Sequence, residues 1–172
     1  MDAYRAWRGV LAAFALGLLS AAACAQDASS GEPQPIPPLR ARVTDLTGTL
    51  SAGDRQALES KLAAWEEKTT NQLAVLIVPT TQPETIEQYG IRVVDAWKLG
   101  QKGKDNGVLF LIAKNDKRMR IEVGYGLEGN LTDVASRRII GDTVAPLFSK
   151  GQFAAGIDAG AERIMRIASG DE

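Results

Sequence analysis

The sequence predicts an α/β protein: a three-layer α/β/α sandwich around a small mixed β-sheet, Rossmann-like in class but without a dinucleotide site. Two observations support this prediction. Short, unbroken apolar runs typical of strands buried on both faces alternate with stretches whose apolar residues recur at helical spacing. A final pair of strands joined by a tight turn adds an antiparallel neighbour, so the sheet should be mixed.

The apolar runs locate three strands. Gln72–Val78 (QLAVLIV) and Gly107–Ala113 (GVLFLIA) are continuous and apolar, as expected for the interior of a sheet. The turn residues Asn115–Lys117 follow, and RMRIEVG then alternates apolar and charged residues. One face of this last strand is therefore wetter, which is typical of a strand near the sheet edge.

Helices fill the remaining segments. The first should begin at Ser51, which stands three residues before Asp54 with the spacing of a capping box. Pro146 should end or kink the third helix, because proline cannot continue the hydrogen-bond ladder. The apolar positions that mark the four helices are Leu58, Leu62 and Trp65; Ile86, Tyr89, Val93 and Trp97; Ala135, Ile139 and Ile140; and Phe153, Ile157, Ala161, Ile164 and Ala168.

The N-terminal residues have the features of a secretory leader. Residues 1–25 begin with two arginines, continue into an apolar stretch and end in Ala-Cys-Ala, which is the pattern of a signal peptide. A Pro-rich linker over 26–38 and one domain over 39–169 should follow. We expect an exported, periplasmic protein that is soluble after cleavage and has no transmembrane segment in its mature chain. Lipoprotein anchoring through Cys24 is the minor alternative.

Composition narrows the chemistry. The 172 residues include no histidine and one cysteine, and that cysteine lies in the leader. Ser-His-Asp triads, thiol nucleophiles, disulfides and Cys/His zinc sites are therefore excluded from the mature chain. Any metal must be held by oxygen atoms, which favours calcium or magnesium. The net charge is −1 and no basic stripe is present, which argues against nucleic-acid binding.

The stretch Gly124-Tyr125-Gly126-Leu127-Glu128-Gly129 has the spacing G-x-G-x-x-G. A dinucleotide-binding turn should follow the first strand of a β-α-β unit and precede another strand that ends in an acidic residue. Here it follows the second strand of a hairpin, and Glu128 would repel a pyrophosphate. We therefore predict no nucleotide cofactor. The glycines Gly107, Gly124, Gly126 and Gly129 should instead serve tight turns.

Hairpin geometry brings two polar loops together. The start of the first hairpin strand lies beside the end of the second, so the loop Lys102–Gly107 should face GYGLEGNLTD. Asp105 and Asn106 would then lie near Glu128, Asn130 and Asp133. Oxygen side chains on glycine-rich loops suit a hard cation.

A simpler interpretation of the same residues is turn and cap chemistry. Thr132 is placed to cap the helix that follows, and Asp133 would be an early-helix carboxylate favoured by the helix dipole. Residue types alone leave both interpretations open.

Three segments together resemble the TPM domain: VTDLTGTLS, GKDNGVLFLIAKNDKRMRIEVGYGLEGNLTD and PLFSKGQFAAGI. The resemblance covers roughly Leu39 to Ala168. It implies an α/β/α sandwich, an exported location and a divalent-metal site, with calcium as the expected ion. By position, Asp105, Asn106, Glu128 and Asp133 match the family's motif residues near that site. Asp45 matches another family acid, although hairpin geometry does not place it there, and capping of the turn before the first helix is an equal alternative.

Two functions follow from the resemblance. The first is a non-catalytic binding module that helps assemble, repair or regulate an envelope or membrane complex through a protein partner. The second is a metal-dependent acid phosphatase acting on phosphate monoesters, with Glu128 or Asp105 as base or nucleophile. The absence of a nucleophile–base pair favours the binding module.

Overall fold

The structure, a computed structural model, describes residues 31–171, so the predicted leader lies outside it. In chain order the elements are β1 (Val43–Asp45), α1 (Ala52–Thr69), β2 (Gln72–Val78), α2 (Ile86–Trp97), β3 (Gly107–Ala113), β4 (Arg118–Val123), the 3₁₀ turn η1 (Tyr125–Leu127), α3 (Asp133–Arg138), the π-helix η2 (Ile139–Val144), α4 (Ala145–Phe148) and α5 (Phe153–Ala168). Across residues 31–171, no helix combines the length and apolar character that a membrane crossing requires.

Within the described residues, four strands form one mixed sheet in the order β1-β2-β3-β4. β1, β2 and β3 run parallel, and β4 pairs antiparallel with β3 at the edge, as its alternating pattern predicts. The register places Phe110 beside Val75 on one side and Ile121 on the other. Both strands predicted from continuous apolar runs have the predicted bounds.

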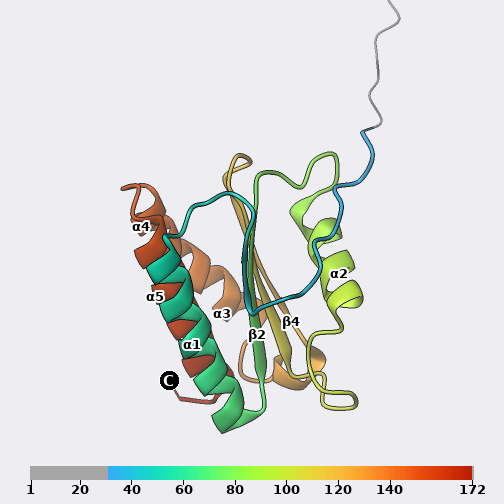
Figure 1. Cartoon of the computed structure of the whole chain (residues 1–172). Helices are drawn as coiled ribbons and strands as arrows, with labels where there is room; N and C mark the ends of the chain where they lie inside the picture. Colours follow the sequence, from blue (N-terminus) through green and yellow to red (C-terminus); the bar gives the residue numbers. More distant parts are fainter. Residues whose placement is uncertain (1–30, 172) are drawn as a thin grey trace, which may run out of the picture.

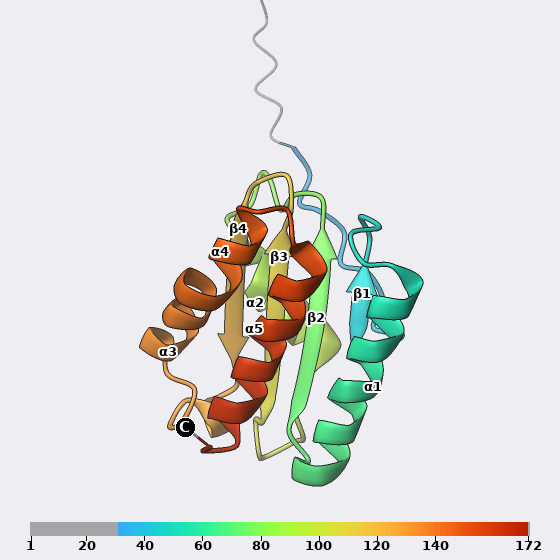
Figure 2. The same ribbon diagram turned by 90° about the vertical axis from the view of Figure 1, so that its left-hand side faces the viewer.

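Helices cover both faces of the sheet, which confirms the three-layer sandwich (Figures 1 and 2). Alternate residues of β3 point to opposite faces because side chains in a strand alternate. Val108, Phe110 and Ile112 pack with residues of α1, η2 and α5. Leu109 and Leu111 pack instead against α2. β3 therefore lies at the centre of two hydrophobic cores, and this fixes its ends in place.

β1 is an element that the sequence analysis missed. It contains three residues, too few to show a periodicity, and it is recognisable only through its parallel pairing with β2. Since α1 and α2 lie on opposite faces while β1, β2 and β3 follow one another in the sheet, the two β-α-β crossovers have opposite hands. Figure 2 shows that the crossover through α1 is the left-handed one, the hand that proteins rarely use.

The predicted third helix is divided into three parts. α3 ends at Arg138, the π-helix η2 widens the next turn, and α4 ends at Phe148. Pro146 neither breaks the chain nor ends the helix at its own position, because it occupies the first turn of α4, where its missing N–H is tolerated. The wider π turn accommodates the proline at the α4 start, and such turns are frequent at functional sites.

The part of the predicted linker that the structure describes is packed on the domain. The Tyr89 hydroxyl donates to the Pro35 carbonyl at 3.1 Å, and Trp97 Nε1 donates to the Pro37 carbonyl at 2.7 Å. Ile36 packs against the α2 core. Residues 35–37 therefore lie against α2 rather than forming a free tether.

Candidate functional site

The two polar loops meet at one end of the sandwich, as hairpin geometry predicts. Gly124 N donates to the Gly107 carbonyl at 2.7 Å, and Gly126 N donates to the Asp105 carbonyl at 3.1 Å. These bonds continue the β3–β4 ladder beyond the strands and fix the 3₁₀ turn η1 against the loop before β3. We call this pair of segments, 102–107 and 124–129, the interlocked loops.

The glycines of the interlocked loops permit a close backbone approach. A Cβ on Gly124 would lie 2.1 Å from the Asp105 carbonyl oxygen, and a Cβ on Gly126 would lie 1.9 Å from that of Lys104. A Cβ on Gly107 would lie 2.5 Å from the Leu99 carbonyl carbon. A Cβ on Gly129, in contrast, would meet nothing within 4 Å. Gly107, Gly124 and Gly126 therefore carry the packing, and Gly129 completes the G-x-G-x-x-G spacing without such a role.

Asn106 is buried, with 5% of its surface exposed, and its amide holds three segments together. Its Oδ1 accepts from Gln101 N at 2.7 Å. Its Nδ2 donates to the Thr70 carbonyl at 2.8 Å and to Asn71 Oδ1 at 3.2 Å. Asn106 thus links the loop before β3 to the end of α1 and the start of β2. With these bonds made, its amide serves the scaffold of the interlocked loops.

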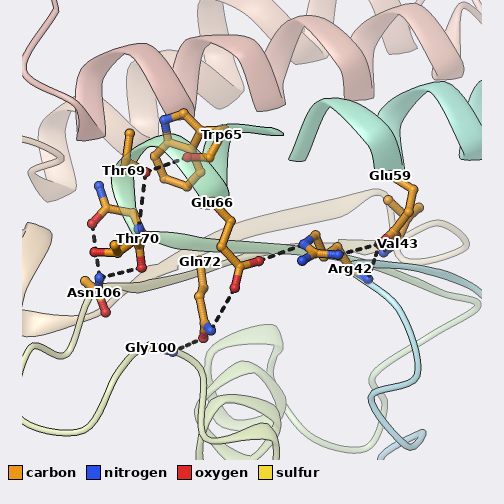
Figure 3. A network of polar contacts seen from close by, with 11 residues as sticks. Arg42, Val43, Glu59, Trp65, Glu66, Thr69, Thr70, Gln72, Gly100 and Asn106 are labelled. Atoms are coloured by element: carbon orange, nitrogen blue, oxygen red, sulfur yellow. Dashed lines mark hydrogen bonds and ion pairs between the residues drawn. The ribbon is translucent and has the colours of Figure 1, made fainter. Parts of the chain in front are cut away.

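A second polar chain runs beside Asn106 across the same end of the sheet (Figure 3). Gln72 Oε1 accepts from Gly100 N at 2.7 Å, and Gln72 Nε2 donates to Glu66 Oε1 at 3.1 Å. The other oxygen of Glu66 accepts from Arg42 Nε at 2.7 Å. The chain ties the segment before β1, the last turns of α1, the start of β2 and the α2–β3 loop together, so the base of the interlocked loops is firmly held.

The side chains of the four predicted loop ligands do not converge on a common site. Asp105, in a left-handed conformation with φ of 48°, and Glu128 expose their side chains, while the Asn106 amide is engaged below them. Asp133 lies in the first turn of α3, where the Thr132 hydroxyl accepts from Ala135 N at 3.2 Å. This confirms Thr132 as the N-cap, and Asp133 lines a separate cavity with Arg120.

These residues fit a calcium ion only in part. Within residues 31–171, no three acidic, histidine or cysteine side chains converge as a metal-binding group. The interlocked loops offer two exposed carboxylates, Asp105 and Glu128, and neither takes part in an ion pair among the described residues. Calcium commonly takes six to eight oxygen ligands. Water or a partner would therefore have to supply most of them.

Asp45 lies at the opposite end of the sheet, at the carboxyl end of β1. Its carboxylate accepts from Thr47 N at 2.9 Å, from the Thr47 hydroxyl at 2.7 Å and from Leu50 N at 2.8 Å. These bonds shape the turn that leads to Ser51, the N-cap of α1. Asp45 therefore has the turn-forming role, and no other predicted ligand accompanies it.

The turn-forming role of the Asp45 carboxylate predicts that the effect of its substitution on stability depends on pH. Partial burial would raise the pKa of Asp45, but hydrogen bonds from Leu50 and Thr47 outweigh it and hold the pKa below its ordinary value. A lowered folded-state pKa stabilises the protein above the unfolded value of about 3.9, and this contribution is lost as pH falls through the folded pKa. Asp45→Asn should lower the free energy of unfolding by about 1–2 kcal/mol at neutral pH.

In denaturant titrations, the difference in free energy of unfolding between wild type and Asp45→Asn should become smaller below about pH 4. Asp95→Asn is the control, because Asp95 is exposed on α2. It should change the free energy of unfolding by less than about 0.5 kcal/mol at any pH. A deficit in Asp45→Asn that persists unchanged in acid would contradict the role of the charged carboxylate.

Tyr125 is a site residue that the sequence analysis did not single out. It is 82% exposed, although it lies on η1 between Gly124 and Gly126, which pack closely against the loop before β3. Leu127, two residues later, is buried and anchors the turn. The sequence does contain a signal for this residue, because Tyr125 is an aromatic residue between two glycines in an otherwise polar loop. The G-x-G-x-x-G spacing drew attention to the glycines instead. The structure thus presents a large, exposed aromatic ring on a rigid support.

Comparison with known proteins agrees with this architecture. The TPM domain family model matches residues 43–167. The N-terminal domain of a protein from P. gingivalis is 30% identical and superimposes with a TM-score of 0.70, covering 75% of this chain and 82% of that one. A protein from Bizionia argentinensis is 20% identical, with a TM-score of 0.63 and coverage of 74% and 86%.

The N-terminal domain of a Corynebacterium glutamicum protein shares the fold at 17% identity, with a TM-score of 0.59 and coverage of 83% and 88%. A search of curated proteins finds no significant match. The family match extends from β1 to the last turn of α5 and includes the interlocked loops. The chain therefore belongs to the TPM domain family.

Proposed function

We propose that this chain is an exported, non-catalytic binding module that engages a protein of the envelope or membrane through its interlocked loops. One observation carries the proposal: Tyr125 is 82% exposed on a turn that backbone hydrogen bonds and glycine packing hold rigid. A preorganised tyrosine loses little conformational entropy on binding, and tyrosine is enriched among residues that dominate interface energies. Assembly, repair or regulation of a complex is the role that such a module would serve.

Tyr125→Ser tests the proposal. Because the ring is exposed, the change should alter the free energy of unfolding by less than about 0.5 kcal/mol. It should weaken partner binding at least tenfold, as expected for loss of an aromatic anchor. Val134→Ser is a matched control, since Val134 is 53% exposed on α3, outside the interlocked loops. Affinity chromatography of an envelope fraction, followed by titration of the retained protein, measures both variants. Equal retention by wild type and Tyr125→Ser would refute the docking role.

Calcium, with magnesium as the alternative, is our proposal for the same loops. Its support is chemical: Asp105 and Glu128 are exposed hard oxygen donors on facing segments. After chelator treatment, calcium should raise thermal stability, by about 2.7 kcal/mol at one hundred times Kd, and should shift amide resonances only around these two residues. Asp105→Asn should abolish the response and Asp133→Asn should leave it intact. An absence of response at millimolar calcium would refute a calcium site in these loops.

Acid phosphatase activity is a second candidate, and one cavity favours it. A space of about 790 Å³ between α3, η2 and α5 is lined by Arg138, Arg163 and Arg166. None of the three forms an ion pair within residues 31–171, and arginine forks match phosphoryl oxygens. If the protein hydrolyses an aryl phosphate and Arg163→Gln abolishes this while Arg137→Gln does not, the non-catalytic proposal is wrong. Turnover at the buffer rate from acid to neutral pH removes the enzyme candidate.

A further inference from the structure

A second cavity lies at the end of the sandwich opposite the interlocked loops. It occupies about 770 Å³ between the β3–β4 turn, α4 and the start of α5, and we call it the hairpin cavity. Figures 1 and 2 show α4 beside this turn, far from η1. Its volume is in the range typical of small-molecule sites. It shares no lining residue with the proposed partner or calcium site, so an inference about it stands independently of the proposed function.

The inner wall of the hairpin cavity is apolar and well positioned. Phe148 and Phe153 pack edge to face with their centroids 5.0 Å apart, and Met119 of β4 also lines the cavity. Gly156 makes room for Phe148, because a Cβ there would lie 2.7 Å from the ring. The wall therefore has a fixed shape and can bury a hydrocarbon chain.

The rim of the same cavity is cationic. Lys114, Lys117 and Arg118 line it, and its lining residues include no acid. None of the three forms an ion pair within residues 31–171. Lys114 is half-buried, with Nζ 5.1 Å from the centroid of the Phe153 ring, so one cation lies directly beside the apolar wall.

The nearest acid on the turn, Asp116, is engaged elsewhere. Its carboxylate accepts from the Thr80 hydroxyl at 2.7 Å and from Thr81 N at 2.9 Å, which holds it toward the loop after β2. Asp116 forms no ion pair with the rim cations, which are therefore available to an anionic ligand. An apolar wall beside cations without ion-pair partners complements a molecule with a hydrocarbon tail and an anionic head.

We propose that the hairpin cavity binds a single-chain anionic amphiphile, of the fatty-acid class, from solution. The acyl chain lies between Phe148, Phe153 and Met119, and the carboxylate lies at the rim beside Lys114. A peptide with an acidic, apolar segment and an anionic bilayer surface are the competing occupants. Unlike the proposed ligand, neither of these occupants is a free, monomeric amphiphile.

The test is titration of the protein with octanoate, decanoate and dodecanoate below their micelle concentrations, followed by calorimetry and by the Met119 methyl resonance. Affinity should rise by up to about fourfold per added methylene, since each buries further apolar surface. Decanol should bind at least fivefold more weakly than decanoate, and dodecyltrimethylammonium should not compete. An affinity that is independent of chain length, or a cation that binds as well as the carboxylate, would overturn the proposal.

Matched variants locate the site. Lys114→Gln should weaken decanoate binding about tenfold, and Met119→Gln, which places an amide in the wall, should abolish it. Lys104→Gln, at the other end of the sandwich, should leave it unchanged. Vesicles of phosphatidylglycerol and of phosphatidylcholine form the last arm. Binding to anionic vesicles without any response to monomeric decanoate, or equal losses in Lys114→Gln and Lys104→Gln, would refute a fatty-acid site.

Discussion

Gly126→Ala should be among the most damaging single substitutions in the domain. The new Cβ would lie 1.9 Å from the Lys104 carbonyl oxygen, and the obstacle is backbone rather than the end of a flexible side chain. The interlocked loops would have to separate, which breaks the hydrogen bond from Gly126 N to the Asp105 carbonyl. Because the loop base is tied to α1 and β2, the displacement cannot be absorbed locally. We expect a loss of at least about 3 kcal/mol in the free energy of unfolding.

The control for Gly126→Ala stands three residues later. A Cβ on Gly129 would meet nothing within 4 Å, so Gly129→Ala should change stability by less than about 0.5 kcal/mol. Gly124→Ala should resemble Gly126→Ala, since its Cβ would lie 2.1 Å from the Asp105 carbonyl oxygen. Urea denaturation of the three variants measures the contrast. Equal stabilities for Gly126→Ala and Gly129→Ala would mean that the loops are not interlocked in solution.

Asn106→Asp should cost about 2–4 kcal/mol at neutral pH. The substitution keeps an acceptor for Gln101 N but replaces the Nδ2 donor with an oxygen that faces the Thr70 carbonyl and Asn71 Oδ1. A buried carboxylate facing two acceptors has no compensation for its desolvation. The variant distinguishes two roles for this residue. If Asn106 were a calcium ligand, a carboxylate would bind the ion more strongly. If its amide holds the loops together, the same change removes the Nδ2 hydrogen bonds and destabilises the fold.

The measurement is urea denaturation of Asn106→Asp with and without calcium. Asn115→Asp, in the exposed β3–β4 turn, is the control and should be near neutral. If calcium restores the stability of Asn106→Asp to that of wild type, Asn106 belongs to an ion site and the scaffold role is secondary. Lasting destabilisation at saturating calcium is the expected result.

The sequence was informative wherever the hydrophobic pattern was pronounced. β2 and β3 were predicted with their observed bounds because both are continuous apolar runs bounded by polar residues. The facing of the interlocked loops also followed from sequence, since an antiparallel pair fixes which ends meet. β1 was missed because three residues carry no period, and within residues 31–171 it pairs with β2 alone.

Side-chain roles within the candidate site were harder to predict. Asn106 and Asp105 are adjacent in sequence, yet one is buried and bonded while the other is exposed. Asp105 has a left-handed backbone conformation, so its side chain and that of Asn106 point in different directions. Residue type predicts this backbone conformation only weakly. The prominence of Tyr125 depended likewise on the three-dimensional approach of two loops. Calcium binding and the choice of partner remain predictions that rest on residue chemistry.

The left-handed crossover through α1 has a kinetic consequence. Within residues 31–171, β1 contributes Val43 alone to a hydrophobic core, whereas β2 and β3 each contribute to both cores. Its pairing with β2 covers three residues, and its connection takes the disfavoured hand. The N-terminal edge should therefore dock last during folding and open first in the native state. Amide protons of Val43 to Asp45 should exchange with solvent much faster than those of β3, even though both belong to one sheet.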